Sequence, residues 1–298
     1  KKEMSGDDVG AWLTFETEQP ETIEVRVGAS FVSVENAMQN LNAETSHLTF
    51  EEIQSKATDI WNKDLSRIIV EGKNETDKTI FYTALYHTLI HPNILQDVNG
   101  EYPAMESNRI LKTSEDRYTV YSLWDTYRNL HPLMTLVYPE RQAAMIRTMV
   151  DMYKESGWLP KWELFGRETY TMEGDPSIPV IVDSWLKGIR DFDVEMAYEA
   201  MFKSATWTDG NLMRPDNDDY TRLGYVPLRE KFDNSVSHAL EYYLADYSLS
   251  VFADGLKKSS DARLFRNRSL KYKKYFDPEY GMLRPKLPNG QFLTPFDP

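Results

Sequence analysis

Two stretches decide how this chain folds and what it binds: YTVYSLWDTYR at residues 118–128 and GWLPKWELFG at residues 157–166. Both mix aromatic rings with charged side chains. A plain helical core does not need this mixture, because a buried indole or charged group must find a polar partner. A sugar site does need it, since flat rings stack on the apolar face of a pyranose while charged groups bind its hydroxyls. The two stretches therefore indicate a carbohydrate-active protein.

The first stretch is predicted to be helical over residues 119–131. At 100° per residue, its aromatic and charged side chains share one arc of about 100°, and that arc holds Tyr121, Trp124, Asp125 and Arg128. In the structural alternative, Asp125 and Arg128 form a local i,i+3 ion pair worth about 0.2–0.5 kcal/mol, and Trp124 belongs to the core. In the functional interpretation, Trp124 and Asp125 line the pocket for a terminal sugar, and Arg128 orients Asp125 or a hydroxyl.

The second stretch is predicted to be a loop, broken from the preceding helix at Pro160. It carries Trp158, Trp162 and Glu163, and loops with two Trp and a Glu more often bind something than pack. A proline-locked loop after a helix can aim its side chains over the mouth of a cavity. We therefore expect these three residues to bind substrate and to face the same cavity as Trp124.

A series of ordered blocks resembles glycoside hydrolase family 92, whose members are exo-acting, calcium-dependent α-mannosidases. The order and approximate spacing of the blocks match along nearly the whole chain, which is more specific than any single motif. The blocks are GASFVSVENAMQNL (28–41), FYTALYHTLIHPN (81–93), YSLWDTYRNLHPL (121–133), SGWLPKWELFGRETY (156–170), PVIVDSWLKGI (179–189), LGYVP (223–227) and FDP (296–298).

The resemblance implies a β-sandwich domain, linking helices and an (α/α)6 toroid. It also implies inverting hydrolysis of terminal α-linked mannose, with a Glu as acid, an Asp as base and calcium on the sugar 2- and 3-hydroxyls. The family blocks that carry these groups follow the FDP block, so no catalytic residue and no metal ligand is assigned here. The chain is expected to be an internal fragment that contacts the remainder of the same protein and is inactive alone. The alternative function is a non-catalytic, helical glycan-binding protein.

Composition excludes some function classes. The chain has no cysteine and a net charge of −13, which argues against thiolate chemistry, nucleic-acid binding and an anionic membrane surface. A neutral, mannose-containing glycan remains compatible with this charge. The residues KKEM at positions 1–4 are not a signal peptide; a periplasmic or secreted location is implied only by the resemblance.

Hydrophobic periodicity predicts a mainly α protein. Alternation at residues 9–16 and 22–27 predicts an antiparallel strand pair, and Ser33 is a candidate N-cap for the first helix. We expect residues 1–32 to end a β-sandwich domain, 33–75 to form linking helices, and 76–298 to form the N-terminal part of the (α/α)6 catalytic barrel. The predicted helices span residues 51–65, 77–89, 119–131, 139–155, 177–188, 192–204, 235–255 and 260–275.

Two further sets of residues are weaker candidates. Glu241 and Asp246 lie in HALEYYLADYSL (residues 238–249), where relatives tend to carry two adjacent acids, so buried hydrogen bonding is favoured over catalysis. His87 and His91 are four apart but lack the Glu of an HExxH zinc motif. Hydrogen-bonded structural histidines are the favoured interpretation of that pair.

Overall fold

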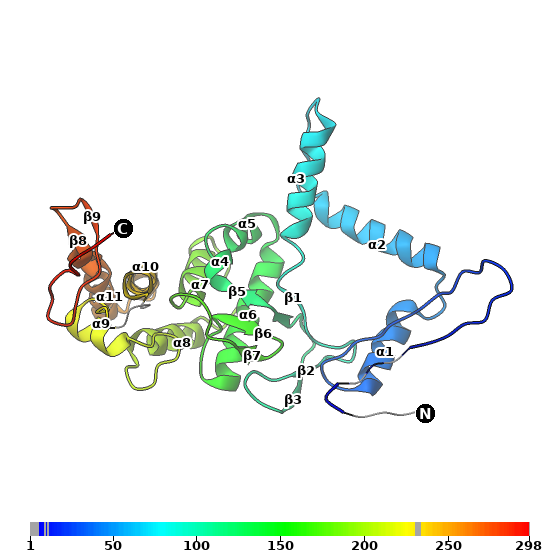
Figure 1. Ribbon diagram of the computed structural model, residues 1–298, viewed down its shortest axis with the longest axis horizontal. Coiled ribbons are helices and arrows are strands. Elements are labelled where there is room, and N and C mark those ends of the chain that lie inside the picture. The colour runs from blue at the N-terminus through cyan, green and yellow to red at the C-terminus, as the bar shows by residue number, and fades with distance from the viewer. Residues whose placement is uncertain (1–5, 9, 11, 230–233, 298) are drawn as a thin grey trace.

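The computed structural model describes residues 6–8, 10, 12–229 and 234–297. Helices dominate it, and they follow one another from α1 at one end of the molecule to α11 at the other (Figure 1). The structure is therefore mainly α, as predicted. Pro298, the last residue of the FDP block, lies outside the described residues. The larger helices after the linking region are α5 (Leu130–Val137), α6 (Pro139–Ser156), α7 (Ser177–Leu186), α8 (Val194–Thr206), α10 (Ser235–Gly255) and α11 (Ser259–Ser269).

The first three helices begin at capping residues. The Ser33 side chain accepts from the Asn36 amide to start α1 (Val34–Thr45), which confirms the predicted N-cap. Thr49 and Glu52 form a capping box at α2 (Phe50–Leu65), and Asn74 caps α3 (Glu75–His87). Helices α2 and α3 project from the rest of the molecule in Figure 1.

The predicted strand pair near the N-terminus is wrong for the residues that the structure describes. Residues 12–27 form no strand, and residues 9 and 11 lie outside the described part. Trp12, Leu13 and Val25 are 83%, 80% and 69% exposed. A two-stranded hairpin is marginal unless its apolar face is covered, and nothing in the described structure covers these side chains.

A polar network, which we call the Asp97 network, attaches α1 and the residues before it to the segment 97–101. Asp97 is only 6% exposed. Its Oδ2 accepts from Ser30 Oγ at 2.7 Å and Asn36 Nδ2 at 2.8 Å, and its Oδ1 accepts from Asn40 Nδ2 at 2.6 Å. Asn36 Nδ2 also donates to Glu101 Oε2 at 2.9 Å. The buried carboxylate is thus satisfied largely by residues that lie more than fifty positions earlier in the chain.

The predicted helix over residues 119–131 is wrong. This segment forms β4 (Tyr118–Thr119), β5 (Tyr121–Ser122) and the single turn α4 (Leu123–Thr126). Strand β5 pairs with β6 (Trp162–Leu164), which pairs with β7 (Arg167–Glu168) in a three-stranded sheet. Asn129 then caps α5, its side chain accepting from the Leu130 amide. The run YTVY therefore contributes to two short strands with different partners, and the helical arc of the prediction does not exist.

The other strands are equally short. Strand β1 (Asn93–Ile94) pairs with β4, β2 (Glu101–Pro103) with β3 (Ile110–Lys112), and β8 (Phe276–Asp277) with β9 (Met282–Leu283). A short helix, α9 (Asn217–Leu223), follows α8, and a 3-10 helix, Leu270–Tyr275, continues α11.

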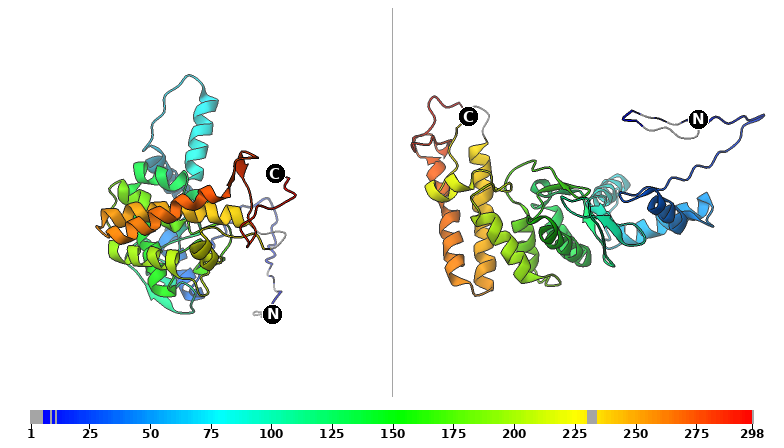
Figure 2. Two further views of the ribbon diagram at one scale, coloured as in Figure 1. Left: turned by 90° about the vertical axis from the view of Figure 1, so that its left-hand side faces the viewer. Right: turned by 90° about the horizontal axis from the view of Figure 1, so that it is seen from below.

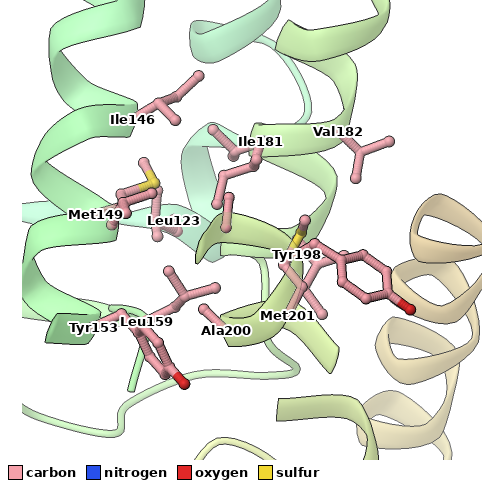
Figure 3. Close-up of a cluster of buried hydrophobic side chains, with 14 of the residues drawn as sticks. Leu123, Ile146, Met149, Tyr153, Leu159, Ile181, Val182, Tyr198, Ala200 and Met201 are labelled. Carbon is pink, nitrogen blue, oxygen red and sulfur yellow. The ribbon is translucent and has the colours of Figure 1, made fainter. Parts of the chain in front are cut away.

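The main apolar core lies between α6, α7, α8, α10 and α11. Helix α6 contributes Ile146 and Met149, α7 contributes Ile181, and α8 contributes Met201, all 0% exposed. Figure 3 shows these side chains turned toward one another from the three helices. Ile146 and Met149 are three residues apart and so lie on the same face of α6.

Helices α10 and α11 run side by side as a helical hairpin (Figure 2). Helix α10 also packs against α7 at Gly255, where an added Cβ would lie 2.2 Å from the Trp185 ring. Only glycine permits this close approach. Helix α10 thus contacts both the main core and the loops that follow α4 and β7.

Candidate functional site

The Glu241 carboxylate on α10 gathers three side chains from the segment 124–128. Its Oε1 accepts from Trp124 Nε1 at 3.2 Å and from Arg128 Nη2 at 2.6 Å, and its Oε2 accepts from Tyr127 Oη at 2.8 Å. The Arg128 guanidinium also lies 4.3 Å from the centre of the Tyr127 ring and 5.2 Å from that of Trp124. We call Trp124, Tyr127, Arg128 and Glu241 the Glu241 cluster. It joins residues more than a hundred positions apart.

The cluster is half open to solvent. The Arg128 side chain is 46% exposed and that of Glu241 is 16% exposed. Burial, followed by the hydrogen bond to the Glu241 carboxylate, raises the pKa of Tyr127 well above its ordinary value. Tyr127 therefore stays a neutral donor at physiological pH. The cluster offers a sugar an indole, a phenol ring and a guanidinium whose positions are fixed by one carboxylate.

Asp125 is exposed beside the cluster and is not bonded to Arg128. The Ser122 hydroxyl donates to its Oδ2. Both Asp125 and Arg128 are described, and no ion pair joins them, because Arg128 binds Glu241 instead. The structural alternative of a local i,i+3 ion pair is therefore wrong. One carboxylate oxygen of Asp125 has no hydrogen-bond donor among the described residues, so it is free to accept from a ligand hydroxyl.

Trp162 and Glu163 lie on opposite faces of the small sheet. In the β5–β6 register Ser122 faces Trp162 and Tyr121 faces Glu163, and successive strand residues alternate in direction. Trp162 thus shares the face of Ser122, whose hydroxyl binds Asp125, whereas Glu163 shares the face of the fully buried Tyr121. The loop interpretation expected both residues to face one cavity, and they do not. The Trp162 Nε1 is buried and has no hydrogen-bond partner among the described residues.

Glu163 is fully buried and bonds only to the protein. Its carboxylate accepts from Thr119 Oγ1 at 2.9 Å, from the Val120 amide at 3.1 Å and from the Gly166 amide at 2.5 Å. Burial raises the pKa of Glu163 to about 7, although the Gly166 and Thr119 bonds favour the ionised form. No atom of this group is available to a ligand in the described arrangement.

Trp158 lies against α8, apart from the Glu241 cluster. Lys203 Nζ is 4.5 Å from the centre of its ring and donates to Gly157 O at 2.8 Å. No described contact joins Trp158 to Trp124 or Trp162. Of the six residues expected to bind substrate, Trp124, Asp125 and Arg128 form one group, and Trp162 lies on the adjoining sheet face. Trp158 and Glu163 are not part of this group.

A family model described as "Glycosyl hydrolase family 92 catalytic domain" matches residues 36–298. The chain belongs to glycoside hydrolase family 92. It is similar, at 37% identity with a TM-score of 0.83, to a family GH92 alpha-mannosidase from Bacteroides thetaiotaomicron, covering 90% of this chain and 36% of that one.

Two further relatives agree with this family membership. A family GH92 inverting mannosidase from the same organism is 31% identical with a TM-score of 0.84, over 90% of this chain and 37% of that one. An uncharacterized secreted glycosidase of Arthroderma benhamiae is 26% identical over 275 residues, which are 85% of this chain and 30% of that protein. The chain thus spans about a third of the length of the relatives that it matches.

In this family 92 chain, Glu241 is the functional candidate that sequence reasoning did not connect to the site. The sequence predicts buried hydrogen bonds for this acid on an aromatic helix. Its bonds to Trp124, Tyr127 and Arg128 make it the support of the candidate site. Only a known contact between α4 and α10 could have revealed this role, because the four residues share no local pattern.

Asp246 has the structural role that was predicted. It is 0% exposed, and its Oδ1 and Oδ2 bind Arg214 Nη1 and Arg268 Nε, each at 2.8 Å. Tyr220 Oη donates to Oδ2 at 2.8 Å, and Asp175 pairs with Arg214 Nε at 2.8 Å. Both carboxylate oxygens of Asp246 are held inside this buried network, so Asp246 is not placed to act on a ligand.

The described residues bring together no group of three or more His, Cys, Asp or Glu that could hold a metal ion. His87 and His91 are both exposed, and His91 Nδ1 lies 3.1 Å from Asn93 Oδ1. Calcium in proteins takes six to eight oxygen ligands. The residues present do not fit such a site, and no calcium ligand is assigned to this chain.

Proposed function

We propose that the complete protein hydrolyses terminal α-linked mannose from glycans, and that this chain supplies part of its sugar site. Family 92 membership supports the reaction class. Two relatives named as mannosidases, one also solved in complex with mannoimidazole, support the substrate class. The observation that carries the proposal is the Glu241 cluster, in which the Trp124 ring and Arg128 are held beside the exposed Asp125.

Each residue has a role in this proposal. The Trp124 indole packs on the apolar face of the sugar, and its Nε1 bond to Glu241 sets the angle of the ring. Asp125 accepts from a sugar hydroxyl, and Arg128, fixed by Glu241, donates to another. Trp162 extends the apolar surface from the adjoining sheet face. These groups bind and orient the sugar; none is placed to act as the acid and base pair that glycoside hydrolysis requires.

The mechanism, the cofactor, the location and the barrel fold of the complete protein are further parts of this proposal. We infer an inverting mechanism, a calcium ion that would be held by residues outside this chain, and a secreted or periplasmic location. One relative is named as an inverting mannosidase and another as a secreted glycosidase. We also propose that the helices of this chain close into an (α/α)6 toroid with the remainder of the protein. In the part of the chain that the structure describes, no helix is both long and apolar enough to span a bilayer.

Asp125→Ala in the complete protein tests the proposal. Loss of the hydroxyl acceptor should lower kcat/KM for an aryl α-mannoside at least tenfold, which corresponds to about 1.4 kcal/mol of transition-state binding. Asp183→Ala on α7 removes a comparably exposed carboxylate, 40% exposed and paired with Lys187, and serves as the control. Wild-type activity and melting temperature in the Asp125 variant would contradict the assignment. Mannoside binding by the wild type without turnover would favour the glycan-binding alternative.

A further inference from the structure

Two backbone segments beside the site adopt conformations that their residues rarely take. Val120, between β4 and β5, has a φ of 63°, and Phe165, in the turn between β6 and β7, has a φ of 51°. Positive φ is a true outlier for a β-branched residue. Such residues cost on the order of 1–3 kcal/mol each and persist only where the surroundings hold them.

Glu163 is the group that holds both segments. One carboxylate oxygen accepts from the Val120 amide at 3.1 Å and the other from the Gly166 amide at 2.5 Å. The Thr119 hydroxyl donates to the same carboxylate at 2.9 Å and accepts from the Phe165 amide at 2.8 Å. Glu163 therefore ties the β4–β5 connection to the β6–β7 turn.

This link lies directly upstream of the sugar-binding residues. Val120 precedes β5, whose last residue, Ser122, is followed by α4 with Trp124 and Asp125. A change in the φ of Val120 would turn the whole segment that follows it. Glu163 also directly follows Trp162 on β6. It is therefore connected both to the segment that carries Trp124 and Asp125 and to the strand that carries Trp162.

We propose that Glu163 is a positioning residue: by holding the Val120 and Gly166 amides, it sets the direction in which the chain enters α4 and thereby the placement of Trp124 and Asp125. This inference rests on the proposed function and replaces the expected contact between Glu163 and substrate. The residue acts through the backbone and touches no sugar.

The role requires a carboxyl group and not an amide. Each oxygen of Glu163 faces one backbone N–H. In Glu163→Gln the amide nitrogen must face one of these N–H groups, so one buried donor meets another donor whichever way the side chain is flipped. The shape and volume of the side chain are almost unchanged, which isolates the hydrogen bonds from packing.

A double-mutant cycle in the complete protein tests the proposal, with Glu163→Gln, Val120→Gly and both together. Glycine adopts positive φ at little cost, so it should reduce the dependence on Glu163. We expect Glu163→Gln to lower kcat/KM for an aryl α-mannoside about tenfold and to speed amide hydrogen exchange over residues 120–126. The double variant should recover most of both effects.

The control is Asp277→Asn, which weakens a remote buried ion pair with Arg284 and should leave exchange at 120–126 unchanged. Equal losses in the single Glu163 variant and the double variant, or unchanged exchange at 120–126 in Glu163→Gln, would overturn the inference. If the wild type does not hydrolyse mannosides, the proposed function fails, while faster exchange that Val120→Gly reverses would still show that Glu163 positions α4.

Discussion

At the scale of single residues, buried or half-buried carboxylates organise the region around the candidate site. Glu241 fixes three side chains and Glu163 fixes two backbone segments. Neither is placed by a local sequence motif. The residues that a sugar would touch, Trp124 and Asp125, can be inferred from sequence because their side chains are chemically unusual together. The residues that hold them in place cannot, because their role depends on contacts across the fold.

Glu241→Gln in the complete protein should weaken the site. Charge-assisted hydrogen bonds are roughly twice as strong as neutral ones, and the substitution removes the charge that Arg128 and Tyr127 share. We expect kcat/KM for an aryl α-mannoside to fall about tenfold, close to 1.4 kcal/mol. Glu199→Gln is the control. Glu199 lies on α8 and accepts one hydrogen bond, from Tyr153 Oη at 2.9 Å. Equal activity in the two variants would contradict the role given to Glu241.

Glu163 should also make stability depend on pH. Its pKa is about 7 in the folded protein and about 4.3 in an unfolded chain, so the folded state binds the proton more tightly. The free energy of unfolding contributed by this group therefore falls as pH rises from about 4.5 to about 7, then levels off. Buried His131, whose pKa is lowered to about 4, acts in the opposite direction below about pH 6.5.

Urea unfolding between pH 5 and 8 measures the Glu163 effect as a difference between wild type and Glu163→Gln. The wild type should lose stability relative to the variant as pH rises, by at most about 1.4 kcal/mol per pH unit. The His131 contribution is common to both proteins and cancels. A difference that does not change with pH would show that the Glu163 pKa is ordinary.

At the scale of elements, the helices with strong local signals were predicted well. Ser33 caps α1 as expected, and α2, α3, α6, α7, α8 and α10 begin within a few residues of their predicted starts. The failure at 118–128 has a physical cause: the partner of β5 is β6, forty residues later, and pairing there outweighs the helical spacing of a few aromatic residues. The N-terminal strands failed because alternation alone does not supply a covering layer.

The contact between α10 and α7 depends on Gly255. An added Cβ would meet the Trp185 ring at 2.2 Å, and such overpacking typically costs about 1–3 kcal/mol. Gly255→Ala should therefore lower the free energy of unfolding by this amount in thermal or urea denaturation. Gly72→Ala is the matched control, because nothing lies within 4 Å of its added Cβ. Equal stability of both variants would show that the Trp185 ring moves aside without cost.

At the scale of the whole molecule, the described chain exposes many large apolar side chains. On α2, Phe50 and Ile60 are 62% and 63% exposed, and Ile69 and Ile80 are 77% and 63% exposed. Apolar exposure of a few hundred Å2, at about 25 cal/mol per Å2, offsets much of a typical folding free energy of about 5–15 kcal/mol. The division of the chain at residues 32 and 75 remains a prediction.

Residues 1–298 expressed alone should therefore not hydrolyse an aryl α-mannoside, with or without calcium, and should self-associate. The candidate site supplies groups that bind a sugar, and we assign to this chain no acid and base pair of the kind that hydrolysis requires. Size-exclusion chromatography with light scattering, followed by a turnover assay, measures both properties. Turnover by a monodisperse monomer would show that the catalytic groups lie within this chain.

The Asp97 network has a practical consequence for dissecting the gene. A shortened protein that starts near residue 76, where the barrel is predicted to begin, would lose Ser30, Asn36 and Asn40 and with them three hydrogen bonds to the Asp97 carboxylate. Hydrogen bonds to a charged group contribute about 1.5–3 kcal/mol each, so three of them are comparable to the whole stability of many domains. The safe cloning boundary for this part of the chain therefore lies before Ser30, so the residues from Ser30 to the end of α1 should be kept with Asp97 when segments are exchanged between homologues.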